Sequence, residues 1–160
     1  MTIAVGDKIP DVTVQVPGPE GPAPAKTGEL LGKGKVVLFG LPGAFTPTCS
    51  DHHLPGFVLR AEDLQAKGVD KIACVSVNDA FVMKAWGEAR EVGEKVTLLA
   101  DGSAVFTKAM GLDVDLTGAG LGVRSKRYAA ILDDGVVTDL AVEEGLGLEI
   151  SSADAVLAKL

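Results

Sequence analysis

The sequence predicts an α/β protein in which helices flank a mixed central β-sheet. Three apolar runs of strand length alternate with segments of helical pattern: KVVLFGL (35–41), KIACVSV (71–77) and KVTLLAD (95–101). Buried runs in this order indicate parallel strands joined by right-handed crossovers. A later segment, RYAAILDDGVVTDLAVE, contains Asp134-Gly135, a strong hairpin signal that adds an antiparallel edge to the sheet.

Local patterns predict the other elements. DVTVQV (11–16) alternates apolar and polar residues, as a half-buried strand does. Residues 17–28 hold four prolines and three glycines, which predicts a loop. Helices are expected over four segments: 48–64, bent or interrupted by Pro55; 80–92, capped by Asn78 or Asp79; 103–110, ended by Gly111; and 151–160, capped by a serine.

Charge and composition exclude several classes of partner. The net charge is −7, and no run of Lys or Arg occurs, so nucleic acid and anionic membranes are repelled on average. No stretch approaches the roughly 20 apolar residues that a membrane span needs. With 47% hydrophobic and 23% charged residues, the chain is typical of globular proteins. We expect one domain over residues 1–160 and a small-molecule or protein partner.

Reactive side chains are concentrated in PGAFTPTCSDHHLPGF (42–57), which directly follows an apolar strand. Ligands of open α/β sheets gather at the carboxyl ends of strands, where this segment is expected. Cys49 falls in the first turn of the next helix, where unpaired N–H groups and the helix dipole favour a thiolate. Pro42 fixes the backbone before it, and the Thr46 hydroxyl can point into the same pocket. The alternative, that Cys49 is only a small apolar residue at a helix start, stays open here.

A metal site made of Cys49, Asp51, His52 and His53 is a competing interpretation of this stretch. Side chains at successive helix positions point about 100° apart, so they do not converge on one ion. Structural zinc sites use spaced pairs of ligands, and a second pair is missing here. We therefore expect no metal and expect His52 to face solvent.

Three separated motifs resemble one family. PGAFTPTC (42–49) is similar to the P-x-x-x-T/S-x-x-C signature of peroxiredoxins, and its continuation through Phe57 resembles their type II, or peroxiredoxin-five-like, branch. ACVSVNDAFVMKAW (73–86) and GVRSKRYAAILDDG (122–135) resemble the same branch, plant and algal members especially. The resemblance covers nearly the whole chain. It implies a thioredoxin-like fold and a thiol-dependent peroxidase that needs no metal, haem or flavin.

The resemblance also implies roles for individual residues. Cys49 matches the peroxidatic cysteine, Thr46 the active-site threonine and Pro42 the first proline of the signature. Arg127 matches the active-site arginine, with Arg124 as a nearby competitor. A permanent cation can stabilise the thiolate and the charge that grows on a peroxide oxygen. The Thr46 hydroxyl can hydrogen-bond to the peroxide, and Pro42 would shield the sulfur from water.

The implied reaction is attack of the Cys49 thiolate on hydrogen peroxide or an alkyl hydroperoxide, which gives a sulfenic acid. Taken alone, Cys74 is a small apolar residue inside a strand. Plant type II members, as the resemblance has it, carry their resolving cysteine at this position. The animal branch has it near the C-terminus, where GLGLEISSADA contains no cysteine. Some relatives work with one cysteine, so resolution by Cys74 stays an expectation, as does reduction by glutaredoxin/glutathione or by thioredoxin.

Two other classes of protein remain to be weighed. A thiol–disulfide oxidoreductase of the thioredoxin type needs a cysteine where Thr46 stands, and a non-catalytic binding module of the same fold is a third class. The family further implies a homodimer. Phe45, Phe81 and Trp86 are candidate apolar contacts for it, although we favour packing in the core for each of them. His53 is expected near the pocket.

The expected compartment is the cytoplasm. Cys49 and Cys74 are too few for a secreted disulfide scaffold, and the start of the chain lacks the pattern of a signal peptide. Two alternatives remain: a mature chloroplast form, or a peroxisomal protein if Ala158-Lys159-Leu160 acts as an address. The same three residues can simply end an amphipathic helix.

Overall fold

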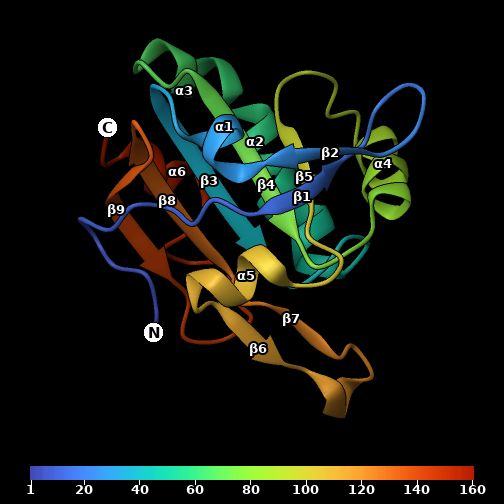
Figure 1. Cartoon of the computed structure of the whole chain (residues 1–160). Helices are drawn as coiled ribbons and strands as arrows, with labels where there is room; N and C mark the ends of the chain where they lie inside the picture. Colours follow the sequence, from blue (N-terminus) through green and yellow to red (C-terminus); the bar gives the residue numbers. More distant parts are fainter.

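A seven-stranded mixed sheet forms the centre of the molecule (Figure 1). The computed structural model describes residues 1–160, and the strand order is β2-β1-β5-β4-β3-β8-β9. The three middle strands run parallel, as predicted: β3 (Lys35–Leu41), β4 (Lys71–Ser76) and β5 (Thr97–Ala100). Two antiparallel strands flank them: β1 (Thr13–Val16) beside β5, and β8 (Tyr128–Asp133) beside β3.

The predicted hairpin is confirmed. Strand β8 continues into β9 (Val136–Val142) and pairs with it antiparallel. The two turn residues both have positive φ, 48° at Asp134 and 82° at Gly135. A two-residue turn of this kind matches the twist of the flanking strands, and Asp-Gly tolerates it well.

The predicted loop over residues 17–28 is wrong in its second half. Strand β2 (Ala23–Lys26) pairs antiparallel with β1, and helix α1 (Thr27–Leu31) follows at once. Prolines normally argue against a strand because they cannot donate to the ladder. Strand β2 tolerates Pro24 because it lies at the edge of the sheet.

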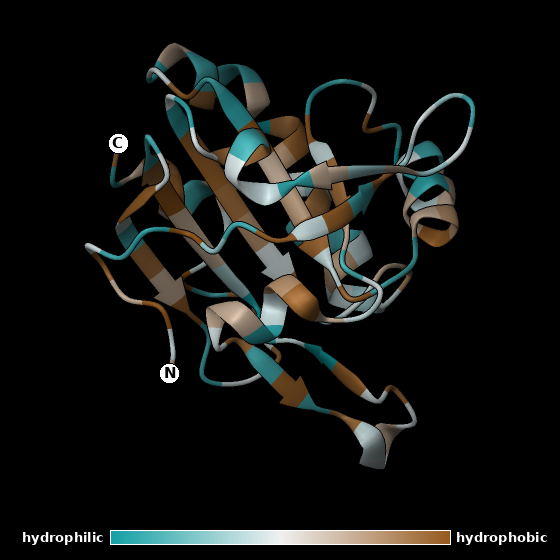
Figure 2. Ribbon diagram, in the orientation of Figure 1, coloured by the Kyte–Doolittle hydropathy of each residue, from teal (hydrophilic) through white to brown (hydrophobic).

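Helices cover both faces of the sheet, as predicted. The face with α2 (Leu54–Leu59), α3 (Ala61–Ala66), α4 (Ala80–Ala89) and α6 (Ala153–Leu157) contains the larger apolar core. Helices α1 and α5 (Val105–Met110) cover the opposite core. Strand residues alternate between the two cores, so β3 and β4 are mainly apolar (Figure 2). The lysine that begins each strand and Ser76 at the end of β4 are the polar exceptions.

The predicted helix 48–64 is interrupted twice. Helical backbone begins at Pro47, and residues Cys49–His53 form a wide π-helical turn, η1, in which Leu54 N–H donates to Cys49 O. We attribute this turn to Pro55, whose ring and missing N–H disrupt regular bonding in the preceding turn. The second break lies at Arg60, which joins α2 to α3 rather than continuing one helix.

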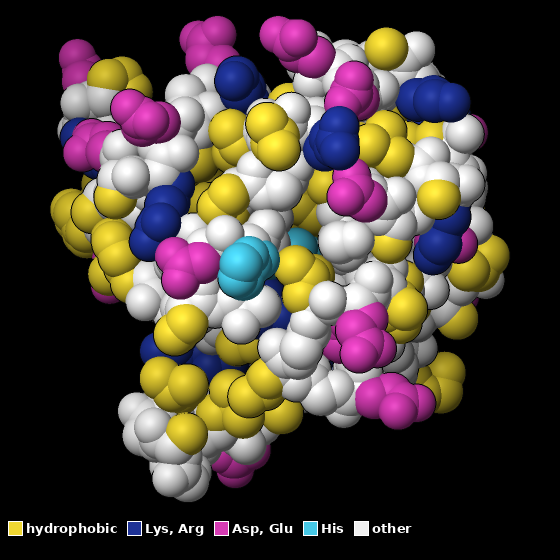
Figure 3. Space-filling model, turned by 180° about the vertical axis from the view of Figure 1, so that it is seen from behind, with side chains coloured by type: hydrophobic (Ala, Val, Ile, Leu, Met, Phe, Trp, Pro, Cys, Tyr) yellow, Lys and Arg dark blue, Asp and Glu magenta, His cyan; other side chains and the backbone are white.

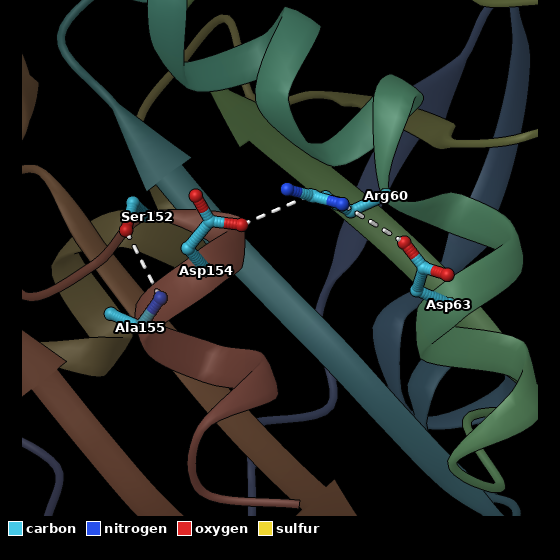
Figure 4. Close-up of polar contacts among 5 residues, drawn as sticks. All are labelled: Arg60, Asp63, Ser152, Asp154 and Ala155. Carbon is cyan, nitrogen blue, oxygen red and sulfur yellow. Dashed lines mark hydrogen bonds and ion pairs between the residues drawn. The ribbon is translucent and has the colours of Figure 1, made fainter.

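Arg60 also ties this corner to the C-terminus. Its guanidinium donates to Asp154 Oδ1 at 3.0 Å and to Asp63 Oδ2 at 3.3 Å (Figure 4). Ser152 caps α6 by accepting from Ala155 N–H at 3.1 Å, in line with the predicted serine cap. Because Arg60 and both of its partners are exposed, these pairs orient the elements and add little stability.

A small second sheet was not predicted from the sequence. Strands β6 (Asp113–Asp115) and β7 (Val123–Ser125) pair antiparallel around a short 3₁₀ turn, η2 (Thr117–Ala119), and project from the body of the molecule (Figure 1). Three-residue strands are too short to show a periodic pattern.

The surface carries mixed charge. Acidic and basic side chains are interspersed over the face opposite to that of Figure 1, and hydrophobic side chains gather around the β6–β7 extension (Figure 3). None of the helices has both the length and the apolar character needed to cross a membrane.

Candidate active site

A tight loop after β3 leads into the Cys49 helix. Arg124 Nη1 donates to Pro42 O at 3.1 Å, and Asn78 Oδ1 accepts from Ala44 N–H at 2.9 Å. Phe45 has φ of 63°, in the left-handed region that a bulky side chain rarely adopts. The loop is therefore held from two sides, by β7 and by the end of β4. A Cβ on residue 43 would clash with the Arg124 guanidinium, so a larger residue there would displace this side chain from Pro42 O.

Thr46 closes this loop next to the cysteine. Its Oγ1 donates to Gly43 O at 2.6 Å, which leaves the hydroxyl oxygen able to accept a further hydrogen bond. Pro42 is buried and Thr46 is half-buried, so the loop separates the cysteine from bulk water but reaches the surface.

Cys49 lies in the first turn of the helix and is completely buried. Arg127 Nη2 is 3.2 Å from its Sγ and donates to it. The sulfur therefore has a permanent cation in contact and free helix N–H groups nearby, both of which favour negative charge.

Arg127 is the buried cation of the site, with only 2% of its surface exposed. Besides the sulfur it contacts two acceptors: Nη1 donates to His53 Nδ1 at 3.0 Å, and Nε donates to Leu146 O at 3.2 Å. None of the ion pairs in the structure involves Arg127, so no carboxylate neutralises it. A buried charge needs a partner, and the Cys49 sulfur is the group in contact that can carry the opposite charge.

His53 supports the arginine as a neutral ring. Its Nε2–H donates to Ser151 O at 2.9 Å, which leaves Nδ1 as the acceptor for Arg127. Burial, reinforced by the neighbouring Arg127 charge, lowers the pKa of His53 from 6.5 to about 3. His53 thus lies at the site, as expected from the resemblance, while His52 is exposed, as expected from the sequence.

Glu143 is a member of this network that the sequence analysis missed. Its Oε2 accepts four hydrogen bonds, from the N–H groups of residues 149, 150 and 151 at 2.9 Å each and from Ser151 Oγ at 2.7 Å. Burial alone would raise the pKa of this carboxyl, but the hydrogen bonds from Ser151 and the backbone lower it below its ordinary value. No sequence signal marks it, because three of its four partners are backbone groups.

Cys74 has entirely different surroundings. It lies in the middle of β4, paired with Phe39 of β3, and it belongs to the same apolar core as Cys49. Burial, together with the nearby Cys49, raises its pKa well above the ordinary value. Both cysteines are free thiols and completely buried.

The other charged groups of the 42–57 stretch do not converge. Asp51 pairs with Arg90 at 3.5 Å, whereas His53 points toward Arg127. No group of three or more His, Cys, Asp or Glu side chains is arranged to hold a metal ion. The competitor Arg124 contacts Pro42 O and Leu121 O instead of the sulfur. A surface cleft of about 510 Å³ beside Leu59 and Arg90 includes none of the predicted site residues.

Comparisons with known proteins identify the family of the chain. The family described as Redoxin matches residues 4–157. The chloroplastic Peroxiredoxin-2E-2 of Oryza sativa subsp. japonica is 54% identical, and the match covers 99% of this chain and 73% of the length of that protein. Peroxiredoxin-2B of Arabidopsis thaliana is 50% identical over 99% of this chain and 98% of its own. The crystal structure of reduced Prx3 from Vibrio vulnificus with hydrogen peroxide has a TM-score of 0.94, with 54% identity over 99% of each chain.

These findings define a thiol peroxidase with the thioredoxin-like fold. The chain belongs to the Redoxin family, in the type II branch of the peroxiredoxins. Proteins of this family act on peroxides and are reduced by thiol proteins. The predictions of family, fold class and peroxidase activity are confirmed.

Proposed function

We propose that Cys49 is the peroxidatic cysteine and that Arg127 stabilises its thiolate and the transition state. The observation that carries this proposal is the 3.2 Å contact between Arg127 Nη2 and Cys49 Sγ. The thiolate attacks one peroxide oxygen, an S–O bond forms and the O–O bond breaks. The leaving oxygen takes a proton and departs as water or an alcohol, while the sulfur is oxidised by two electrons to a sulfenic acid.

Thr46 and Pro42 complete the proposed site. With its proton donated to Gly43 O, the Thr46 oxygen can accept a hydrogen bond from the peroxide and orient it toward the sulfur. Pro42 excludes water from the thiolate. Because Cys49 is completely buried, a small movement of the 42–46 loop must admit the peroxide.

The first experiment compares two serine variants under steady-state turnover of hydrogen peroxide. Cys49→Ser should lose essentially all peroxidase activity, because serine is far less nucleophilic than a thiolate at neutral pH. Cys74→Ser, the matched control, should still consume one equivalent of peroxide and form a sulfenic acid. A Cys49→Ser protein as active as the parent would refute the assignment.

We further propose that Cys74 resolves the sulfenic acid within one chain. Its thiol attacks the Cys49 sulfur, water leaves and an S–S bond forms. Both residues lie in one core on the same face of the sheet, which supports this pairing. Cys49 must leave Arg127 and rotate toward β4, so the η1 turn unwinds on oxidation. Mass spectrometry after one equivalent of peroxide should find a 49–74 link; a persistent sulfenic acid without that link would contradict it.

The reductant is the next part of the proposal. Glutaredoxin with glutathione, or thioredoxin, would attack the disulfide or the sulfenic acid and return Cys49 to the thiol. Steady-state kinetics with the two donor systems, compared side by side on hydrogen peroxide and an alkyl hydroperoxide, distinguishes them.

We propose a homodimer that uses the apolar surface near the site. Phe45 is 54% exposed and Phe81 is 72% exposed, as apolar contacts at an interface require. Trp86 is completely buried, so of the two roles expected for it, core packing is confirmed and an interface contact is not. Sedimentation of the parent and of Phe81→Ser over a concentration series should show a dimer that the variant weakens.

The cytoplasm remains the proposed compartment, with a chloroplast as the alternative because two relatives are named chloroplastic. The peroxisomal interpretation has less support. Lys159 Nζ binds Asp139 Oδ2 at 2.8 Å and Leu160 packs against the core, so the terminal residues are engaged with the fold. Immunolocalisation of the untagged protein in its own cells tests the three compartments.

A further inference from the structure

The segment between β9 and α6 holds the active-site arginine although it has no regular structure. Residues 144–151 contain no helix or strand, and most of them are exposed. Two backbone carbonyls of this segment nevertheless fix the site: Leu146 O binds Arg127 Nε, and Ser151 O binds His53 Nε2. The position of the cation against the sulfur therefore depends on the conformation of this segment.

Glu143 is what fixes that conformation. Its Oε2 collects the N–H groups of three successive residues, 149 to 151, together with the Ser151 hydroxyl. Successive N–H groups that converge on one anion form a nest, and such charge-assisted hydrogen bonds are about twice as strong as neutral ones. At its other end, Glu143 N–H donates to Arg127 O at 2.9 Å.

These contacts form a closed ring. The backbone of Glu143 holds the backbone of Arg127, and its carboxylate holds the segment whose carbonyls orient Arg127 and His53. Every link lies between 2.7 and 3.2 Å. The carboxylate makes no contact with Arg127 itself, so it orders the site without neutralising the cation.

We propose that Glu143 is a positioning residue of the peroxidase reaction, which acts by holding residues 146–151 so that Arg127 stays against the Cys49 sulfur. This inference rests on the proposed roles of Cys49 and Arg127. If Glu143 is lost, the segment relaxes, Arg127 moves and the sulfur loses part of its cation. A displacement of about 1 Å in such a contact can cost up to about a hundredfold in rate.

The test compares Glu143→Gln with Glu144→Gln, its exposed neighbour, which undergoes the same change of charge. Glutamine keeps the shape and one acceptor oxygen. It lacks the negative charge that strengthens the hydrogen bonds of the nest. The rate constant for reduced protein and hydrogen peroxide, measured by competition with catalase, should fall about tenfold in Glu143→Gln. In Glu144→Gln it should stay within about twofold of the parent.

A second measurement distinguishes positioning from simple support of the fold. Alkylation of Cys49 by iodoacetamide, followed by peptide mass spectrometry over a pH series, reports how well the cation stabilises the thiolate. The charged or titratable side chains near the sulfur are Arg127, the neutral His53 and Cys74. The midpoint of the profile should move to higher pH in Glu143→Gln and stay in place in Glu144→Gln.

Three outcomes overturn the proposal. Glu143→Gln could react like the parent in both assays. It could lose rate only in proportion to the unfolded fraction, with an unmoved alkylation profile. If Glu143→Gln does not fold, Ser151→Ala decides, because it removes one of the four donors and keeps the backbone; an unchanged rate and profile there overturn the proposal. An active Arg127→Gln protein, in contrast, would refute the proposed function itself.

Discussion

Cys49 and Cys74 are equally buried in one core, yet their immediate surroundings differ. Cys49 contacts the Arg127 guanidinium at a helix start, whereas Cys74 lies among apolar side chains in the middle of a strand. Burial raises the pKa of Cys74 well above the ordinary value, so this residue stays a thiol. The comparison teaches that a neighbouring charge, and not exposure, separates the cysteine suited to attack a peroxide from one that is not.

The variant with the largest expected effect removes the positive charge beside Cys49. Arg127→Gln keeps a hydrogen-bond donor but no cation, so the rate constant with peroxide should fall by about 10²- to 10³-fold, as when an oxyanion-stabilising donor is lost. Stopped-flow peroxide consumption by the reduced protein measures it. Arg60→Gln, which loses only exposed ion pairs, is the control and should match the parent. If Arg127→Gln reacted with peroxide as fast as the parent, the charge of Arg127 would not be what distinguishes Cys49 from Cys74.

A somewhat smaller effect is expected when the two cysteines of one molecule compete for a reagent. In the folded, reduced protein at neutral pH, iodoacetamide should modify Cys49 about a hundredfold faster than Cys74, because the thiolate is the nucleophile. Quantitative peptide mass spectrometry gives the ratio. In denaturant the two rates should become similar, which is the control, and equal rates in the folded state would contradict the interpretation.

The smallest effect concerns the neutral His53, which belongs to the surroundings of Cys49 alone. The folded protein holds its pKa at about 3, whereas an unfolded chain binds this proton near pH 6.5. Between these values the unfolded state binds more protons, so the free energy of unfolding decreases as the pH falls, by up to about 1.4 kcal/mol per pH unit. Glu143, whose pKa is also lowered, adds a loss in the same direction only below about pH 4.3.

Urea unfolding between about pH 5 and 7 therefore isolates the histidine. His53→Gln should flatten the pH dependence in this window, since glutamine does not titrate, and His52→Gln should leave it unchanged. An equal slope in His53→Gln and the parent would show that His53 is not the group responsible.

The sequence was sufficient for the elements that depend on apolar runs and strong turns. Strands β3, β4 and β5 and the Asp134-Gly135 hairpin follow from local composition. Strand β2 was missed because the prolines of residues 17–28 favour a loop, and an edge position is a property of the whole sheet. The β6–β7 pair was missed because a strand of three residues is too short to show an alternation of apolar and polar side chains.

The residues of the site also fall into those that could be predicted from the sequence and those that could not. Cys49, Thr46 and Pro42 lie within one local motif, so sequence reasoning could place them together. The choice between Arg127 and Arg124 needed the family resemblance, since the two lie three residues apart in one short segment. In the structure Arg127 contacts the sulfur and Arg124 contacts a loop carbonyl. Glu143 could not be predicted, because it acts on backbone N–H groups, which every sequence contains.

One buried contact next to Cys49 gives the protein a built-in optical signal. Trp86 is the only tryptophan of the chain, and its Nε1–H donates to Ser50 Oγ at 2.9 Å. Ser50 lies in the η1 turn that is proposed to unwind when Cys49 is oxidised. Unwinding would break this hydrogen bond and change the environment of the indole. Tryptophan emission should therefore report each oxidation and reduction of the protein in real time, without a label.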